Sequence, residues 1–275
     1  MWRRPARWRF LVFAAVKSRL GAVLVILGGL VLTGIALHPL EAPVWAMIQA
    51  REPALRLSSG VEQMEQALVS GLLGGFRAAA ADFAWLQAYG LAEERDLPAT
   101  ESMLRLVTVI DSRALYFWLN GARIMAYDMP GWRIVAAGGY ARVPVAAQER
   151  ITHEQAVRAL RHLDEAMKFH PASAALWIER ANIELNRLGD TAGAAASYRR
   201  AWEQPNAPYY APRLHAELLR RLGRKPAALA WLIKLHPQLP TENESAGAAL
   251  VLTRIRVLER ELGVPAGQAY RPACR

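Results

Sequence analysis

The sequence predicts an all-α protein, in which one N-terminal transmembrane helix is followed by a solenoid of about four helical hairpins. Three observations predict this fold class. An uncharged run lies near the N-terminus, nearly every later segment has the 3.6-residue periodicity of an amphipathic helix, and similar segments recur every 34–35 residues. No segment alternates apolar and polar residues as a half-buried strand does.

The uncharged run covers residues 20–37, LGAVLVILGGLVLTGIAL. At about 1.5 Å rise per residue, a helix of this length spans roughly 27 Å, close to the hydrocarbon thickness of a bilayer. Residues 1–19 form a basic tail with six Lys or Arg residues and no acid, which predicts a cytoplasmic N-terminus and a periplasmic C-terminal domain. We therefore expect a single-pass protein of a bacterial inner membrane. The alternative is a cleaved signal peptide with a weak site at Gly34-Ile35-Ala36, which would also export the domain.

Proline and glycine indicate the remaining boundaries. Residues 38–60 contain Pro39, Pro43 and Pro53, so we expect a juxtamembrane connector without a long helix. The helical-repeat domain is predicted for residues 61–262 and a C-terminal tail for residues 263–275.

The repeated unit is clearest in residues 175–208. Its two helices are separated by the turn Leu188-Gly189-Asp190, and the second helix has Ala194, Tyr198 and Ala201 at spacings of 0, +4 and +7. Two small residues and one ring on a single face allow two helices to approach closely. The same spacing recurs at Ala159, Leu163 and Ala166, at Ala228, Leu232 and Leu235, and in a degenerate form at Thr100, Leu104 and Val107.

These units resemble the tetratricopeptide repeat (TPR) family, whose pattern is W-x2-L-G-x2-Y, then A-x3-F, then P. The resemblance covers roughly residues 81–242 as about four repeats, with residues 247–262 as a capping helix. It departs from the pattern at Asn182, where the family prefers Gly or Ala, and at His215, where it prefers Leu. The resemblance implies a superhelix whose first helices line a concave groove for a peptide or partner helix. The alternative is an ordinary alanine-rich helical bundle.

The second unit is interrupted. Its first helix is expected at residues 115–129 and its second helix from about Thr152. Residues 130–151 between them contain three glycines and two prolines, so they are predicted to form an inserted loop.

The repeat frame implied by the resemblance places aromatic, Arg and Asn side chains in the groove. These types anchor interfaces and bind carboxylates, so the hypothesis is a groove for a segment with acidic or C-terminal carboxylate groups. The alternative is that Arg220, Arg221 and their neighbours form a solvated helix end. The predicted groove residues are Trp85, Tyr89, Tyr116, Arg123, Tyr127, Asn186, Arg187, Tyr210, Arg213, Arg220 and Arg221.

Motifs for chemistry are missing from the sequence. His153-Glu154 lacks the second histidine of a zinc helix, and the lone cysteine, Cys274, excludes a multi-cysteine metal site. We therefore expect no cofactor, no metal and no enzymatic activity. The expected function is that of a membrane-anchored scaffold or assembly factor, which mediates protein–protein interaction with other envelope proteins or peptides.

Two other functions stay open. One is an envelope enzyme with its site in residues 130–152, because long ordered loops in compact domains are often functional. The other is a binder of anionic polymers that uses the basic C-terminal half. No nucleic acid is expected as a partner, because six of the ten net positive charges belong to the N-terminal tail.

Overall fold

The computed structural model describes residues 77–240 and 242–272, and every regular element in these ranges is helical. This confirms the predicted all-α class for the described part of the chain. The elements in chain order are α3 (Arg77–Glu93), α4 (Leu97–Ile110), α5 (Leu115–Arg123), the π-helix η3 (Ile124–Asp128), α6 (Met129–Ala136), α7 (Val145–Phe169), α8 (Ala174–Arg187), α9 (Thr191–Trp202), α10 (Tyr210–Arg221), α11 (Lys225–Leu235), the 3-10 turns η4 (His236–Gln238) and η5 (Glu244–Ala246), and α12 (Ala248–Glu261).

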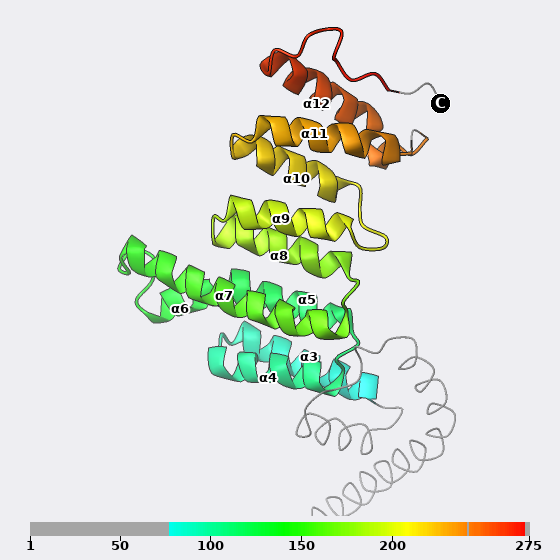
Figure 1. The fold of residues 1–275 in the computed structure, drawn as a ribbon. Helices are drawn as coiled ribbons and strands as arrows, with labels where there is room; N and C mark the ends of the chain where they lie inside the picture. Colours follow the sequence, from blue (N-terminus) through cyan, green and yellow to red (C-terminus); the bar gives the residue numbers. More distant parts are fainter. Residues whose placement is uncertain (1–76, 241, 273–275) are drawn as a thin grey trace, which may run out of the picture.

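The helices pair into hairpins that stack one upon another (Figure 1). Helix α3 pairs with α4, α5 with α7, α8 with α9 and α10 with α11, and α12 covers the end of the stack. The second helix of one hairpin also contacts the first helix of the next, as α7 contacts α8 and α9 contacts α10. The described part of the chain is therefore an elongated array of hairpins.

Local chemistry sets where each hairpin reverses. The Asp190 carboxylate accepts a hydrogen bond from the backbone N–H of Gly193 at 2.8 Å, and Asp96 accepts one from Ala99 at 3.1 Å, so each acid caps the second helix of its hairpin. Gly189, in the turn before α9, has a φ of 66°, a left-handed conformation that glycine adopts without a Cβ clash. These three residues lie at the turns that the sequence predicts.

Small residues let the helices of a hairpin pack closely. Ala181 on α8 and Ala194 and Ala201 on α9 are fully buried at their contact. The Tyr198 hydroxyl donates a hydrogen bond of 2.6 Å to the side-chain oxygen of Asn182. His215 forms a hydrogen bond of 2.7 Å through Nδ1 with the Ala195 carbonyl. Asn182 and His215, which depart from the repeat pattern, are thus polar links between packed helices.

The structure differs from the inserted loop expected at residues 130–151. Helix runs from Leu115 to Ala136 through the π-turn η3, and α7 already begins at Val145, so only residues 137–144 lie between helices. Pro130 lacks an N–H and would clash with the preceding turn of a regular α-helix, but the wider π-helix η3 ends at Asp128, and Pro130 lies in the first turn of α6 after it. The extra residues therefore lengthen both helices into an arm, formed by α6 and the start of α7, that projects beyond the stack (Figure 1).

None of the helices in the described residues combines the length and apolar character that crossing a bilayer requires. The segment predicted to cross it, residues 20–37, lies outside the described ranges, as do the basic tail, the connector and the start of the predicted repeat domain.

Candidate interaction site

The predicted groove residues lie on the first helices of four successive hairpins. Helix α3 carries Trp85 and Tyr89; α5 and η3 carry Tyr116, Arg123 and Tyr127; α8 carries Asn186 and Arg187; and α10 carries Tyr210, Arg213, Arg220 and Arg221.

Aromatic rings join the first two of these helices. The rings of Trp85 and Tyr116 meet edge to face with centroids 5.5 Å apart. Phe117, which the sequence analysis did not single out, is buried beneath both rings. Tyr89 and Tyr116 are more than half exposed, so this end of the first-helix row offers aromatic surface to solvent.

Arg123 is engaged in a contact between hairpins. Its Nε and Nη2 lie 2.9 Å and 2.8 Å from one carboxylate oxygen of Glu179 on α8, whose side chain is only 4% exposed. A buried carboxylate needs such a partner, because an isolated charge in the interior is strongly unfavourable. The Arg123 guanidinium therefore holds α5 against α8.

Three tyrosines form what we call the tyrosine cluster: Tyr198 on α9, and Tyr127 on η3 and Tyr210 on α10, which both lie near enough to act electrostatically on Tyr198. Burial is the largest cause that raises the pKa of Tyr198 to about 12, and the nearby phenols of Tyr210 and Tyr127 and the carboxylate of Glu179 contribute to the same shift. Burial also raises the pKa of Tyr127, although a hydrogen bond with Asn186 opposes this shift. The raised pKa values keep the phenols of Tyr127 and Tyr198 neutral hydrogen-bonding groups at neutral pH, and Tyr210 is 43% exposed.

Arg187 extends this cluster with a positive charge. Its guanidinium carbon lies 4.4 Å from the centre of the Tyr127 ring, which is a cation–π contact. Its Nε is buried without a hydrogen-bond acceptor, and among the described residues no carboxylate lies within ion-pair distance of the guanidinium. The Tyr127 ring therefore orients the Arg187 guanidinium, which can still donate hydrogen bonds to a ligand.

The arginines at the end of α10 differ from Arg187. Both Arg220 and Arg221 contact the Glu217 carboxylate, at 2.7 Å and 3.2 Å. The Arg220 hydrogen bond is the largest cause that lowers the pKa of Glu217 to about 2. Arg213 lies against the backbone of Gly247, just before α12. Among the predicted groove arginines, Arg187 is the one with a cation–π contact to a ring of the tyrosine cluster in the described part of the chain.

Two depressions in the described surface have volumes of about 490 Å³ and 770 Å³, and the second lies beside Arg187. It is lined by Tyr127 and Arg187 together with residues of the arm, including Tyr140 and His153. No hydrogen bond between described residues joins His153 to an acid, as a general base held by an orienting carboxylate would need. Within the same residues, no three His, Cys, Asp or Glu side chains gather as a metal site requires.

Sequence reasoning missed Glu179, Tyr198 and Asn182 as parts of this site. Tyr198 was expected only as a packing ring, and Glu179 carries no local signal because its partner, Arg123, lies 56 residues away. No protein-family model matches this chain, and no significantly similar curated protein or solved structure was found.

Proposed function

We propose that this chain is a membrane-anchored, TPR-like scaffold or assembly factor of the bacterial cell envelope, which binds a partner protein on its first-helix face. The binding surface centres on the tyrosine cluster and Arg187. The observation that carries this proposal is Arg187 itself, whose guanidinium is stacked on Tyr127 and has no carboxylate partner among the described residues.

The geometry favours a ligand with a carboxylate. A guanidinium presents paired donors that match a carboxylate, and a ring beneath it fixes its orientation. The neighbouring phenol of Tyr127 adds a neutral hydrogen-bonding group, and the exposed ring of Tyr210 adds apolar surface. Aromatic and Arg side chains of this kind dominate the binding energy of protein interfaces. We therefore expect an acidic side chain or a C-terminal carboxylate of the partner to contact Arg187.

The proposed location rests on residues 20–37 and the basic tail before them. If these residues anchor the chain, its helical hairpins lie on the periplasmic side. A phosphatase reporter fused after Arg275 should then be active, and a reporter that works only in the cytoplasm should be inactive there. The opposite pattern would contradict the periplasmic location without affecting the proposed binding face.

Site-specific photo-crosslinking tests the binding face. A photoreactive amino acid at position 210, where Tyr210 is exposed, should capture a partner in intact cells. Arg187→Glu should reduce the yield of this adduct about tenfold, because the reversed charge repels the partner carboxylate. Arg161→Glu on α7 makes the same charge change at another exposed arginine and should leave the adduct intact.

Two outcomes would contradict the proposal. One is an adduct at position 210 whose yield is the same in the Arg187→Glu and wild-type chains. The other is capture only from a control position on α4, such as Leu106, which is exposed on a second helix.

A further inference from the structure

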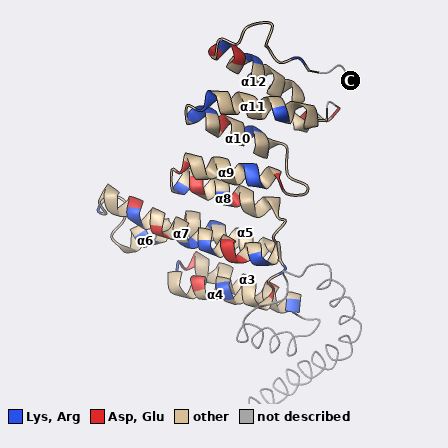
Figure 2. Cartoon of the chain, in the orientation of Figure 1, with Lys and Arg blue, Asp and Glu red and all other residues tan. Residues whose placement is uncertain are grey.

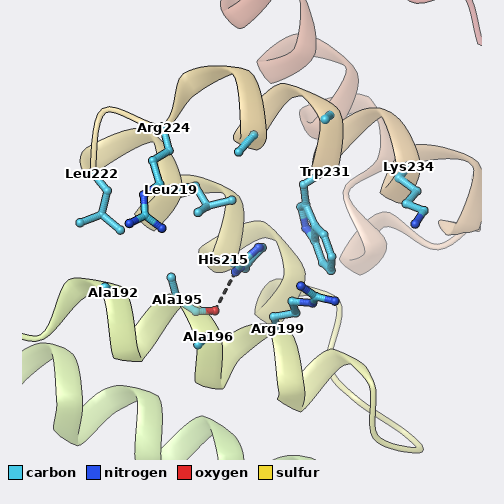
Figure 3. A pocket seen from close by; sticks show the side chains of 12 residues that line it. Ala192, Ala195, Ala196, Arg199, His215, Leu219, Leu222, Arg224, Trp231 and Lys234 are labelled. Carbon is cyan, nitrogen blue, oxygen red and sulfur yellow. Dashed lines mark hydrogen bonds between the residues drawn. The ribbon is translucent and has the colours of Figure 1, made fainter.

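A second hollow, of about 490 Å³, lies between the second helices of two neighbouring hairpins, α9 and α11 (Figure 3). It is separate from the predicted groove, because α10 contributes His215, Leu219 and Leu222 here rather than the residues of its first-helix face. Pockets of about 300–1,000 Å³ are large enough to take a ligand group with several contacts. The residues that line the hollow determine which ligand fits it.

One wall is a single stripe of α9. Ala192, Ala195, Ala196 and Arg199 are spaced at i, i+3, i+4 and i+7, so they share one face of the helix. Three of the four are alanines, which leave room for side chains of another helix to approach the backbone. Arg199 ends the stripe and contacts Glu203 at 3.0 Å, with both side chains more than half exposed.

The opposite wall has the same spacing on α11. Ala227, Ala230, Trp231 and Lys234 again fall at i, i+3, i+4 and i+7. The Trp231 ring is held in place, since its Nε1 donates a hydrogen bond of 2.9 Å to the Pro212 carbonyl and its ring meets His215 edge to face at 4.5 Å. The floor of the hollow is therefore apolar and rigid.

Positive charges stand at both ends of this apolar floor. Arg199 and Lys234 lie at one end beside Trp231, and Arg224 points into the other end beside Leu222 (Figure 3). No acidic residue lines the hollow, and among the described residues neither Arg224 nor Lys234 lies within ion-pair distance of a carboxylate.

The sequence around the hollow also carries a net positive charge. Residues 199–234 contain eight Lys or Arg residues and two Glu residues, and Figure 2 shows basic residues gathered where α10 meets α11. A ligand for this hollow must therefore carry negative charges on either side of an apolar part.

The spacing of the charges identifies the form of the ligand. Arg224, the residue just before α11, and Lys234 near its end are ten residues apart, which is about 15 Å at 1.5 Å rise per residue; this is close to the distance between acidic residues at i and i+11 of a docked helix, which share one face of that helix. Apolar residues at i+3 and i+4 of that helix would face the alanine walls and Trp231. A nucleic acid, by contrast, presents charges at every backbone step and is usually held on exposed rings along a continuous basic groove.

We propose that the hollow between α9 and α11 is a second docking site, which takes a partner helix with acidic residues eleven positions apart on either side of an apolar stretch. This site lies on a different face from the one in the proposed function and does not depend on it.

The test uses a fluorescein-labelled peptide, Glu-Ala-Ala-Leu-Leu-Ala-Ala-Leu-Leu-Ala-Ala-Glu repeated twice, titrated with the full-length chain and followed by fluorescence anisotropy. The expected result is saturable binding that weakens about tenfold when Gln replaces every Glu in the peptide. Lys234→Glu and Arg224→Glu should each weaken binding by a similar factor. Ala196→Leu should also weaken it by filling the hollow, and it leaves every charge in place at an exposed helical position.

Matched controls separate this site from general charge and from the first-helix face. Arg161→Glu and Arg187→Glu should bind the peptide as the wild type does. Equal weakening by Arg161→Glu, equal affinity for the Glu and Gln peptides, or no effect of Ala196→Leu would each overturn the assignment. So would tighter binding of a twelve-nucleotide oligothymidine, or of inorganic phosphate, that is lost in the Lys234→Glu and Arg224→Glu variants, because the site would then serve a polyanion or a free anion.

Discussion

The α3–α7 region and the α8–α12 region bury polar side chains in different ways. In the first, Thr100, Gln155 and His162 are buried with polar side-chain atoms that have no hydrogen-bond partner among the described residues. In the second, the buried Glu184 accepts a hydrogen bond from Ser197 at 2.6 Å, and the buried Glu259 accepts one from the backbone N–H of Tyr270. The comparison teaches that the same stacking of hairpins tolerates both a poorly paired and a well paired interior.

Removing the Arg123–Glu179 ion pair, which joins the two regions, should have the largest effect on the free energy of unfolding. Arg123→Ala leaves the buried Glu179 carboxylate without its partner, and we expect a loss of about 2–3 kcal/mol, moderated because the Arg123 side chain is half exposed. Urea unfolding measures this change. Arg161→Ala is the control and should stay within about 0.5 kcal/mol of the wild type. If Glu179→Gln fails to restore stability in the Arg123→Ala background, the loss has another origin.

Acid should weaken the first region through His162. Burial lowers the pKa of His162 from 6.5 to about 4. Between these values the unfolded chain binds more protons than the folded chain, so this contribution to stability is present above pH 6.5 and is lost as the pH falls toward 4. The loss between pH 7 and pH 5 is about 2 kcal/mol. His162→Leu should flatten the pH dependence of unfolding in this range; an unchanged slope would exclude His162 as its source.

Replacing glycine by alanine should have opposite effects on stability at a tightly packed helix position and at an open one. A Cβ at Gly121 on α5 would lie 2.9 Å from Nε2 of the buried His162, so Gly121→Ala should destabilise the fold by about 1–2 kcal/mol through overpacking. Gly90 on α3 has nothing within 4 Å of such an atom, so Gly90→Ala should stabilise by about 0.5–1 kcal/mol through helix propensity. Thermal unfolding compares them, and the same sign for both would contradict this account.

The smallest expected change in stability concerns an unpaired buried amide in the α3–α7 region. Gln155 on α7 is 1% exposed, and neither its Oε1 nor its Nε2 has a partner among the described residues. Gln155→Met keeps a similar shape without the buried amide and should raise the unfolding free energy by about 1 kcal/mol. A destabilised Gln155→Met variant, measured by urea unfolding, would mean that the amide is satisfied, for instance by a buried water molecule.

The sequence predicts the hairpins well because their turns depend on neighbouring residues. Gly189 and Asp190 act on the backbone within a few positions, and their effects follow from residue type alone. The residues of the proposed binding face were chosen from the repeat frame, and the structure places Tyr127 on the π-helix η3 and Arg187 at the end of the first helix α8.

Interactions that depend on three-dimensional register are not predictable in this way. Pro130 reads as a helix breaker, yet the π-turn before it lets the helix continue, and nothing in the residue types announces that turn. The Arg123–Glu179 pair and the hollow between α9 and α11 exist only because particular faces of separate hairpins meet. Periodicity along one helix says which residues share a face but not what that face meets.

The arm formed by α6 and the start of α7 makes this hairpin a lever. Helix α7 has 25 residues and a length of about 37 Å, whereas α8 has 14 residues and a length of about 21 Å. A slight rocking of the base within the stack is therefore magnified at the tip, near residues 137–144. Binding of a partner at the tip would therefore be coupled to the tilt of this hairpin, at a distance from the stack that the shorter hairpins do not reach.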